Sequence, residues 1–336
     1  MSADVSQHRV PELQGKVAAT PAPGGRRRWW FRRVLGEHPA GLLLAAPYAL
    51  FVAAVFVYPL GLGVWMSFHR YFFSAPGAVV PHPFVGFKNY ATVISDPAVR
   101  ASFVHVGEFL VINVPLTVVI SLLLATALNN AIHWRGFLRV SYYVPYVTAS
   151  VAMITVWMFM FSSGGIVDRI LGPLAPNPAW LVNTTWAMPS IAFYVTWKQM
   201  GFFILLFLAA LQNVPEELNE AAAIDGASRW QSYRTVTIPA VRPATTLVVL
   251  LAIITGANLF TEPYLMTSGG GPNGATTTPV FLLYQKGIEQ GTPDVASAIG
   301  VLLVIGVLII AYASRKVTER ELTHPTLSAC RVGAAH

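Results

Sequence analysis

Apolar residues are gathered along this chain in six long runs that contain few charged side chains. The hydrocarbon core of a bilayer is about 30 Å thick, so a helix rising about 1.5 Å per residue needs about 20 apolar residues to cross it. Each of the six runs reaches that length. The pattern predicts an all-α membrane protein with six transmembrane helices at approximately residues 40–67, 104–130, 138–161, 186–211, 244–266 and 295–314.

The segments between and beyond these runs differ in composition. The terminal segments, residues 1–35 and 317–336, show no apolar periodicity, and we expect both tails to be largely disordered around a transmembrane domain at residues 40–316. Gly, Pro and Asn, which favour turns, are frequent in the three loops expected on the outer side: residues 68–103, 162–185 and 267–294.

The overall composition agrees with this interpretation. Only 11% of the residues are charged and 54% are hydrophobic, whereas an average soluble domain has about 25% charged residues. A soluble chain of this size has a large surface that must be wetted, so it could not hide so much apolar side-chain area. The composition excludes an ordinary soluble protein and indicates contact with lipid.

The formal net charge of +7 comes largely from the N-terminal tail. There, tryptophans stand among arginines before the first apolar run, as is typical of a cytoplasmic membrane interface, and we expect no nucleic-acid partner. The run itself is about twice as long as the core of a signal peptide, which predicts a retained helix. The arginines are Arg26, Arg27, Arg28, Arg32 and Arg33.

Positive charge also orients the chain, because Lys and Arg close to membrane spans are retained in the cytoplasm. If both termini are cytoplasmic, 16 of the 22 Lys and Arg residues lie on the cytoplasmic side. Six spans place both termini on the same side, so the span count and the charge asymmetry agree. We predict an N-in, C-in protein of the bacterial inner membrane.

The most polar segment between two runs, residues 213–243, reads as two short helices. Asn213 and Pro215 form a start signal, and Gly226 breaks the first helix. Ser228 can cap a second helix that continues to about Val236, before prolines 239 and 243 end it. The small side chains of the first helix suit docking into the groove of a partner, although a plain surface linker has the same pattern.

This segment resembles the EAA motif of ABC importer permeases, in the form found in the carbohydrate uptake family that includes the maltose transporter. The resemblance extends over about residues 40–316 and implies the type I ABC importer permease fold. The motif residues are Glu220-Ala221-Ala222, Ile224-Asp225-Gly226-Ala227, Trp230, Tyr233, Ile238-Pro239 and Pro243, and the further matches are Phe84–Tyr90, Val144–Tyr146, Leu208–Gln212 and Leu265–Pro272. One departure is an extra glycine in Gly269-Gly270-Gly271-Pro272.

The resemblance implies three kinds of protein partner. A second, homologous permease subunit completes the translocation pathway, an extracytoplasmic binding protein delivers the cargo, and a cytoplasmic ATPase dimer docks on the EAA loop. The residues expected to couple to the ATPase are Glu220, Ala221, Ala222, Asp225, Gly226 and Ala227.

We expect no catalytic residue and no cofactor in this chain. It has no GxxxxGK[ST] nucleotide loop, no HExxH or GxSxG motif, and a single cysteine, which excludes a thiolate metal cluster. ATP and Mg would therefore be used by the partner ATPase.

Lys198 lies near the middle of the fourth run, where insertion of a lysine costs about 2.5–3.5 kcal/mol. It is either a substrate-pathway residue or half of a buried ion pair with Glu108 or Glu262. The resemblance to the maltose transporter implies pathway positions at Tyr146, Ser150, Val195, Lys198, Gln199, Phe202, Thr255, Gly256, Asn258 and Leu259. Val195 replaces a hydrogen-bonding amide of that pattern. A lone amide in a span, Asn113, is more commonly a bond between helices.

Three functions remain open from the sequence. A sugar or oligosaccharide is the expected cargo, since the predicted pathway mixes aromatic and hydrogen-bonding side chains. An anionic cargo such as a glycerol phosphate would instead pair with Lys198. A stand-alone secondary transporter could share the six spans, but it would leave the EAA motif unexplained.

Overall fold

The protein is described by a computed structural model, which covers residues 39–73, 80–130 and 134–320. The expected N-terminal tail with its arginine cluster, and residues 321–336 of the C-terminal tail, lie outside the described residues. Contacts divide the chain into two units, Met1–Leu60 and Gly61–His336. Each unit is described by itself.

The first described segment is one continuous helix built from three parts. α2 (Pro39–Val52), the π-helical turn η1 (Ala53–Val57) and α3 (Tyr58–Ser67) follow one another without a break. The wide π turn ends two residues before Pro59, whose ring would collide with the carbonyl four residues earlier in a regular α-helix. Leu44–Phe68 is long and apolar enough to cross a membrane, which confirms the first predicted span.

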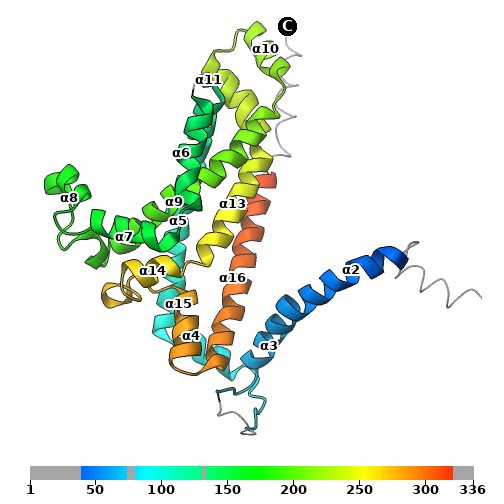
Figure 1. The fold of residues 1–336 in the computed structure, drawn as a ribbon, viewed down its shortest axis with the longest axis vertical. Coiled ribbons are helices and arrows are strands. Elements are labelled where there is room, and N and C mark those ends of the chain that lie inside the picture. Colours follow the sequence, from blue (N-terminus) through cyan, green and yellow to red (C-terminus); the bar gives the residue numbers. More distant parts are fainter. Residues whose placement is uncertain (1–38, 74–79, 131–133, 321–336) are drawn as a thin grey trace, which may run out of the picture. The chain divides into compact units, whose positions relative to one another are not determined.

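The second unit is built around four long helices that run beside one another in Figure 1. α5 packs against α9 and α13, and α13 also packs against α16. Three of the four match predicted spans closely, although α5 begins outside its predicted bound of 104. The helices are α5 (Pro97–Asn130), α9 (Ala187–Gln212), α13 (Arg242–Ala257) and α16 (Pro293–Arg320).

The contact between α5 and α9 follows from the spacing of small residues on α5. Its buried positions recur every three or four residues and include Ser121 and Ala125, which allow close approach. Asn113 is buried there, and its Nδ2 donates a hydrogen bond to Thr196 Oγ1 at 2.8 Å. The expectation that this amide joins two helices is confirmed.

Two apolar cores form along this helix pair. One surrounds Ile154 and Trp157 of α7 (Ser150–Met160), and the other surrounds Val248 and Ala252 of α13. A third, smaller core lies at the other end, between α5, α16 and two short elements, α4 (Lys88–Ser95) and α15 (Pro279–Tyr284). The π turn η6 (Gln285–Glu289) follows α15 and packs against α16.

The predicted third span is broken. α6 (Arg135–Val147) and α7 are separated by Thr148 and Ala149 and are bent by 96° relative to each other. Figure 1 shows α7 turning away from the direction of α6. Hydropathy could not predict this break, because the apolar pattern continues through it.

The predicted fifth span is wrong in its second half. The helix ends at Ala257, and Asn258 to Phe260 interrupt it before the short helix α14 (Thr261–Met266). Asn258 caps the end of α13, where its Nδ2 donates to the carbonyl oxygen of Ile254 at 2.7 Å. The amide side chain therefore ends the helix inside an apolar run.

The outer loops are tied by side-chain hydrogen bonds. In the first loop, Asn89 Nδ2 donates to the carbonyls of Ser67 and His69, each at 3.0 Å, and the Tyr90 hydroxyl lies 2.7 Å from Ser67 Oγ. The second loop contains α8 (Ile166–Leu171) and two 3-10 turns, η2 (Gly172–Leu174) and η3 (Trp180–Val182). Trp180 Nε1 donates to Asp168 Oδ1 at 2.6 Å.

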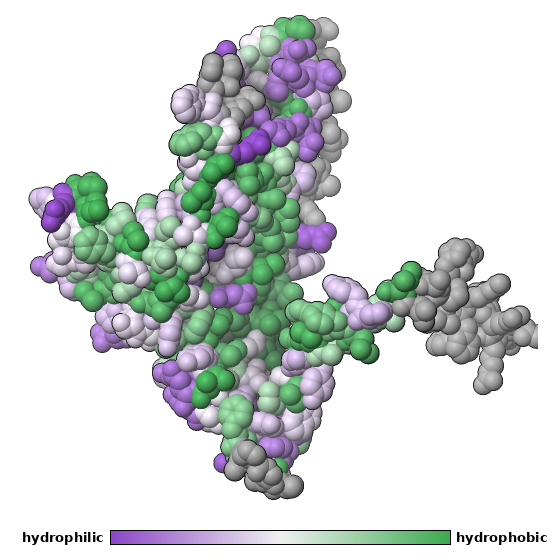
Figure 2. All heavy atoms as spheres, viewed as in Figure 1, coloured by the Kyte–Doolittle hydropathy of each residue, from purple (hydrophilic) through white to green (hydrophobic). Residues whose placement is uncertain are grey.

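In the part of the chain that the structure describes, four helices are long and apolar enough to cross a membrane, and six spans result if each bent pair counts as one. Helices make up nearly all the regular structure of these residues, and the only bridge between extended residues joins His69 and Phe84. The predicted all-α membrane fold is confirmed. Figure 2 shows hydrophilic residues gathered over one end of the second unit.

Candidate functional site

The hydrophilic end carries the loop of residues 213–243, whose first helix is α10 (Glu216–Ile224). Pro215 stands at its N-cap, and Glu216 and Glu217 place negative charge near the positive helix end. Asn213, expected to start this helix, instead stands at the C-cap of α9, where its Nδ2 donates to the carbonyl of Ala209 at 3.0 Å.

The first helix ends as predicted at Gly226. Gly226 has a φ of +82°, its N–H donates to the carbonyl of Ala223 at 3.1 Å, and the N–H of Ala227 donates to the carbonyl of Ala222 at 2.9 Å. These two bonds form a Schellman motif, which satisfies the last carbonyls of a helix and requires a left-handed residue. Glycine adopts that conformation without strain.

The second helix of the loop begins at a capping box. Ser228 Oγ accepts from the N–H of Gln231, and Gln231 Oε1 accepts from the N–H of Ser228. The helix consists of α11 (Arg229–Ser232), the π turn η4 (Tyr233–Thr237) and α12 (Ile238–Ala240). It continues past the predicted end because the π turn accommodates Pro239, as η1 accommodates Pro59.

Both helices are fixed to each other and to the bundle. Ser232 Oγ donates to Asn219 Oδ1 at 2.9 Å, and the Tyr233 hydroxyl lies 3.2 Å from Thr126 Oγ1 at the end of α5. Val241, just after the loop helices, is buried in the core with Leu128 and Leu211. The loop is thus held as a rigid extension of the helices behind it.

The outer surface of this loop is exposed and partly apolar. Ile224 is 86% exposed and Trp230 is 67% exposed, although both are large apolar side chains. Of the predicted coupling residues, Glu220, Ala221, Asp225 and Gly226 are exposed, and Ala222 and Ala227 are half-buried. Such a surface favours contact with a partner over a role as a plain linker.

A second cluster of predicted residues meets at the break between α6 and α7. Lys198 Nζ of α9 donates a hydrogen bond to Ser150 Oγ, the first residue of α7. One helical turn along α9, the ring of Phe202 stacks on Tyr146 of α6, with centroids 5.2 Å apart and an interplanar angle of 16°. The structure therefore brings four predicted pathway residues together from three helices.

The break itself carries polar backbone groups into the apolar part of the fold. Thr148 Oγ1 and the Thr148 N–H both bond to the carbonyl of Val144, at 2.7 and 3.0 Å. Non-helical backbone at membrane depth is tolerated only inside protein or beside a water-filled cavity. The surroundings of Ser150 and Lys198 are accordingly suited to polar contact.

Lys198 is half-buried, and among the described residues no carboxylate lies within ion-pair distance of it. The expected alternatives, Glu108 and Glu262, are both described and neither forms this pair. The interpretation of Lys198 as half of a structural ion pair therefore has no support among the residues that the structure describes.

The other predicted pathway residues are spread over the fold. Thr255 and Asn258 are exposed near the end of α13, and Gln199 is half-buried beside Lys198 on α9. Gly256 is buried against α5, where a Cβ atom would lie 2.7 Å from Leu110 Cδ2. Its position serves close helix contact instead of an open surface. Val195 and Leu259 are buried in the first core.

Sequence reasoning missed Gly201, which sets the distance between α6 and α9. A Cβ atom at this residue would lie 2.1 Å from the carbonyl oxygen of Tyr142. Only glycine lets the two backbones come so close, and this contact holds Tyr146 beside Phe202. A single glycine in an apolar run gives no signal of such a contact.

No group of three His, Cys, Asp or Glu side chains in the described ranges could hold a metal ion. The site is instead two surfaces: an exposed helical loop at one end and a polar cluster at a broken helix.

Comparison with known proteins gives these surfaces a context. The family described as "Binding-protein-dependent transport system inner membrane component" matches residues 109–324. The permease protein AraP of the arabinooligosaccharides transport system of Bacillus subtilis (strain 168) is 30% identical over 312 residues, which cover 92% of this chain and 97% of AraP. The permease protein MalF of the trehalose/maltose transport system of Thermococcus litoralis is 32% identical over 283 residues, covering 84% and 94%.

A solved structure shows the same fold. A chain in the crystal structure of a bacterial ABC transporter involved in the import of the acidic polysaccharide alginate has a TM-score of 0.64 and 20% identity. The match covers 88% of this chain and 99% of that chain. The predicted importer permease fold is confirmed.

Proposed function

The chain belongs to the family of binding-protein-dependent transport system inner membrane components, and from this membership we propose that it is the permease subunit of an ATP-driven importer for sugars or oligosaccharides. The names of AraP and MalF both refer to transport systems for such cargo. As a member of the family, the chain is an inner-membrane component that works with a binding protein. It is a transport component, and we propose that it catalyses no reaction itself.

The observation that carries this proposal is the rigid, exposed loop of residues 213–243. Its two helices present Ile224 and Trp230 to solvent, and the hydrogen bond from Tyr233 to Thr126 connects the loop to α5. Force applied to such a loop reaches the bundle because the loop has little freedom to bend. We propose that a cytoplasmic ATPase dimer, which uses ATP and Mg, docks here through the predicted coupling residues.

The polar cluster at the α6–α7 break supports the second part of the proposal, which is that the cargo is a sugar. A sugar needs donors for its hydroxyl groups and flat apolar faces for its C–H surface. Lys198 and Ser150 offer hydrogen bonds, and Tyr146 and Phe202 offer rings. A second permease subunit would close the other side of the pathway.

The proposal is tested by purification in mild detergent of the tagged chain from its native host, followed by ATPase assays with the binding protein. An ATPase subunit and a second permease are expected to co-purify, and sugar-loaded binding protein should stimulate ATP hydrolysis. Ile224→Glu should release the ATPase, because it places a charge in the docking surface. Leu174→Glu, at an equally exposed apolar residue in an outer loop, is the matched control.

A stand-alone secondary transporter predicts different results. Its uptake would follow an ion gradient, it would purify without an ATPase, and Ile224→Glu would leave uptake unchanged. Any of these outcomes would refute the proposed coupling loop.

A further inference from the structure

The second outer loop, residues 162–185, exposes large aliphatic side chains. Ile166 and Ile170 are one turn apart on α8, so they lie on the same face of this helix, and Leu174 follows them in η2. Ile170 is 79% exposed and Leu174 is 81% exposed. Phe159, near the end of α7, is exposed as well. Wetting apolar surface costs about 25 cal/mol per Å², so this part of the loop is suited to apolar surroundings.

The charged side chains of the same loop are bonded within it. Asp168 accepts two hydrogen bonds, from Trp180 Nε1 to Oδ1 at 2.6 Å and from the Gly164 N–H to Oδ2 at 2.9 Å. Arg169 Nε donates to the carbonyl of Gly164 at 3.1 Å. These bonds satisfy polar groups without water, as a segment at an apolar boundary requires. The loop therefore bonds its charges internally while it exposes its aliphatic side chains.

The start of α9 shows that this loop is level with the outer boundary of the membrane. Trp186 stands at the N-cap of α9 and is exposed, and tryptophan is enriched at membrane interfaces. Its ring lies 5.6 Å from that of Trp180, which packs against the first core and fixes the loop at this level. From here α9 continues for 26 residues, about 39 Å at about 1.5 Å per residue, which is enough to cross a hydrocarbon core of about 30 Å.

Helix α7 leads into the loop in a direction close to the membrane plane. α6 packs against the membrane-crossing helix α9, and α7 is bent by 96° relative to α6. Figure 1 shows α7 running across the direction of the long helices. A helix in this direction changes little in depth along its length, so α8 stays near the boundary between headgroups and acyl chains, where apolar helix faces insert by about 5–10 Å.

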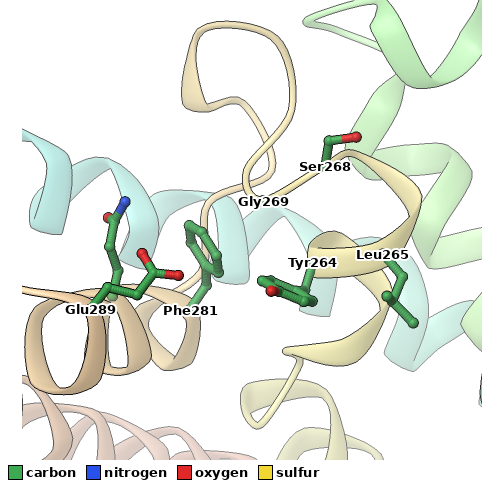
Figure 3. Close-up of a pocket in the computed structure, with 7 residues that line it drawn as sticks. Tyr264, Leu265, Ser268, Gly269, Phe281 and Glu289 are labelled. Atoms are coloured by element: carbon green, nitrogen blue, oxygen red, sulfur yellow. The ribbon is translucent and has the colours of Figure 1, made fainter.

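The third outer loop, residues 267–294, has a different surface. Figure 3 shows Tyr264 and Phe281 beside each other, and the centroids of their rings are 6.1 Å apart. Tyr264 also packs with Phe260 and Tyr284. The polar side chains of Ser268 and Glu289, by contrast, are exposed. Covered rings and exposed polar groups suit a loop surrounded by water, whereas the second outer loop combines bonded charges with exposed aliphatic side chains.

We propose that the second outer loop is a membrane anchor, in which Ile166, Ile170 and Leu174 insert into the outer leaflet between headgroups and acyl chains. The guanidinium of Arg169, the one basic side chain of this loop, is exposed and pairs with lipid phosphate. The anchor holds α7 at a fixed depth beside the break from α6. It lies at the opposite end of the fold from the loop of residues 213–243, so charging it is not expected to release an ATPase.

The test is spin-label EPR on the chain, with the subunits that co-purify with it, in nanodiscs of phosphatidylethanolamine and phosphatidylglycerol. Cys330 is the one cysteine of the chain, so Cys330→Ser, with cysteine-free partner subunits, allows a nitroxide to be placed at Ile170→Cys or Leu174→Cys. Oxygen dissolves in acyl chains, whereas a nickel chelate stays in water. We expect labels at both residues to collide severalfold more often with oxygen than with the chelate.

Ala98→Cys, at an exposed residue near the outer end of α5, is the control on the water side. Val106 of α5 and Met188 in the first turn of α9 belong to the same core, so Ala98 lies about 12 Å further out at about 1.5 Å per residue. A label there should collide mainly with the nickel chelate. Retained ATP hydrolysis checks that each labelled complex is assembled, and Ile166→Cys replaces either loop position whose label disturbs assembly.

Two results would overturn the anchor. Labels in the loop that collide mainly with the nickel chelate would lie in water. Labels shielded from both reagents would be covered by protein: by the binding protein if its removal restores the collisions, and otherwise by the second permease subunit. Either result at a loop position is sufficient. The anchor concerns only the contact of this loop with lipid, so its failure would leave the proposed function as an importer intact.

Discussion

Helix α9 and the bent pair α6–α7 are neighbours in the bundle, but they meet the demands of a membrane in opposite ways. α9 is continuous from Ala187 to Gln212, so its backbone groups pair within the helix, and more than half of its apolar window is buried. α6 and α7 are interrupted at Thr148 and Ala149 and bent by 96°. Lipid cannot satisfy the backbone at such a break. We propose that the side of α9 that faces α5 supports the fold, and that the break, together with Lys198 and Phe202 on the side of α9 that faces α6 and α7, meets polar cargo.

The largest expected loss of stability and uptake comes from a substitution that forces α9 and α6 apart. Gly201→Val places side-chain atoms where a Cβ alone would lie 2.1 Å from the Tyr142 carbonyl. Overpacking of a close contact costs about 1–3 kcal/mol or more, and here backbone blocks any relaxation. We expect a drop in Tm of the purified complex together with loss of uptake.

Gly107→Val on α5 is the matched control for this substitution. It also adds a branched side chain to an apolar helix, but nothing lies within 4 Å of the added Cβ. Its Tm should stay close to that of the wild type. Equal falls in Tm and uptake in the Gly201→Val and Gly107→Val variants would show that the close contact at Gly201 has no special role.

The next largest effect is expected for Lys198, at the break between α6 and α7. Its substitution distinguishes a loss of transport from a loss of stability. Lys198→Ala removes the charged group that donates to Ser150, which is its hydrogen-bond partner within the described chain. In the proposed pathway Lys198 also donates to a sugar hydroxyl, and a charge-assisted hydrogen bond is worth about 1.5–3 kcal/mol, so kcat/KM for a neutral sugar should fall about tenfold to a hundredfold. Tm should fall by no more than the loss of the single hydrogen bond to Ser150 requires, because no ion pair among the described residues is broken.

The pattern of loss also reports on the cargo. Uptake of an anion such as a glycerol phosphate would be abolished by Lys198→Ala, whereas uptake of a neutral sugar would only be weakened. A fall in Tm as large as the fall in uptake would instead make Lys198 a structural residue, and the break would lose its assigned role.

The continuous helix α9 and the two helix breaks also differ in how well the sequence predicted them. The sequence interpretation placed α9 at 186–211, within one residue of the observed bounds at each end, because a continuous apolar run fits a continuous helix. The breaks after Val147 and Ala257 were not predicted, since apolar residues flank both of them, valines and Ala149 at the first break and isoleucines, Ala257 and Leu259 at the second. Local hydropathy contains no information on whether a neighbouring helix can satisfy an interrupted backbone.

The residues of the candidate site also divide into those whose role the sequence predicted and one whose role it did not. The cost of burying a charge pointed to Lys198, and the loop at 213–243 was predictable from its turn and capping residues. The resemblance to the maltose transporter grouped Tyr146, Ser150 and Phe202 with Lys198 before any contact was known. Gly256 lay in the same group, but its packing against α5 depends on residues more than a hundred positions away in the sequence.

A third break, at Gly226, tests whether a tightly bonded turn is needed to transmit force. Gly226→Val forces a branched residue into a left-handed conformation, which costs about 1–2 kcal/mol, whereas asparagine tolerates that conformation better. Nothing lies within 4 Å of the added Cβ, so the strain is in the backbone alone. We expect Gly226→Val to lower the ATP-coupled transport rate severalfold and Gly226→Asn to retain most of it. Equal rates in both variants would mean that the turn conformation is irrelevant to coupling.

The smallest expected change in stability comes from the contact between the two continuous helices α5 and α9. Asn113 and Thr196 form one buried hydrogen bond between α5 and α9, at 2.8 Å, and Asn113 Oδ1 has no partner among the described residues. Hydrogen bonds between membrane helices contribute about 0.6 kcal/mol on average, so a double-mutant cycle with Asn113→Ala and Thr196→Ala should give a coupling energy of that order. The cycle is measured by unfolding in mixed micelles, and uptake should persist in all three variants. A coupling above about 1.7 kcal/mol would exceed the largest value found for such bonds. Loss of uptake with folding intact would give the side of α9 that faces α5 a direct part in transport, and it would break the contrast between this supporting side and the proposed pathway side with Lys198 and Phe202.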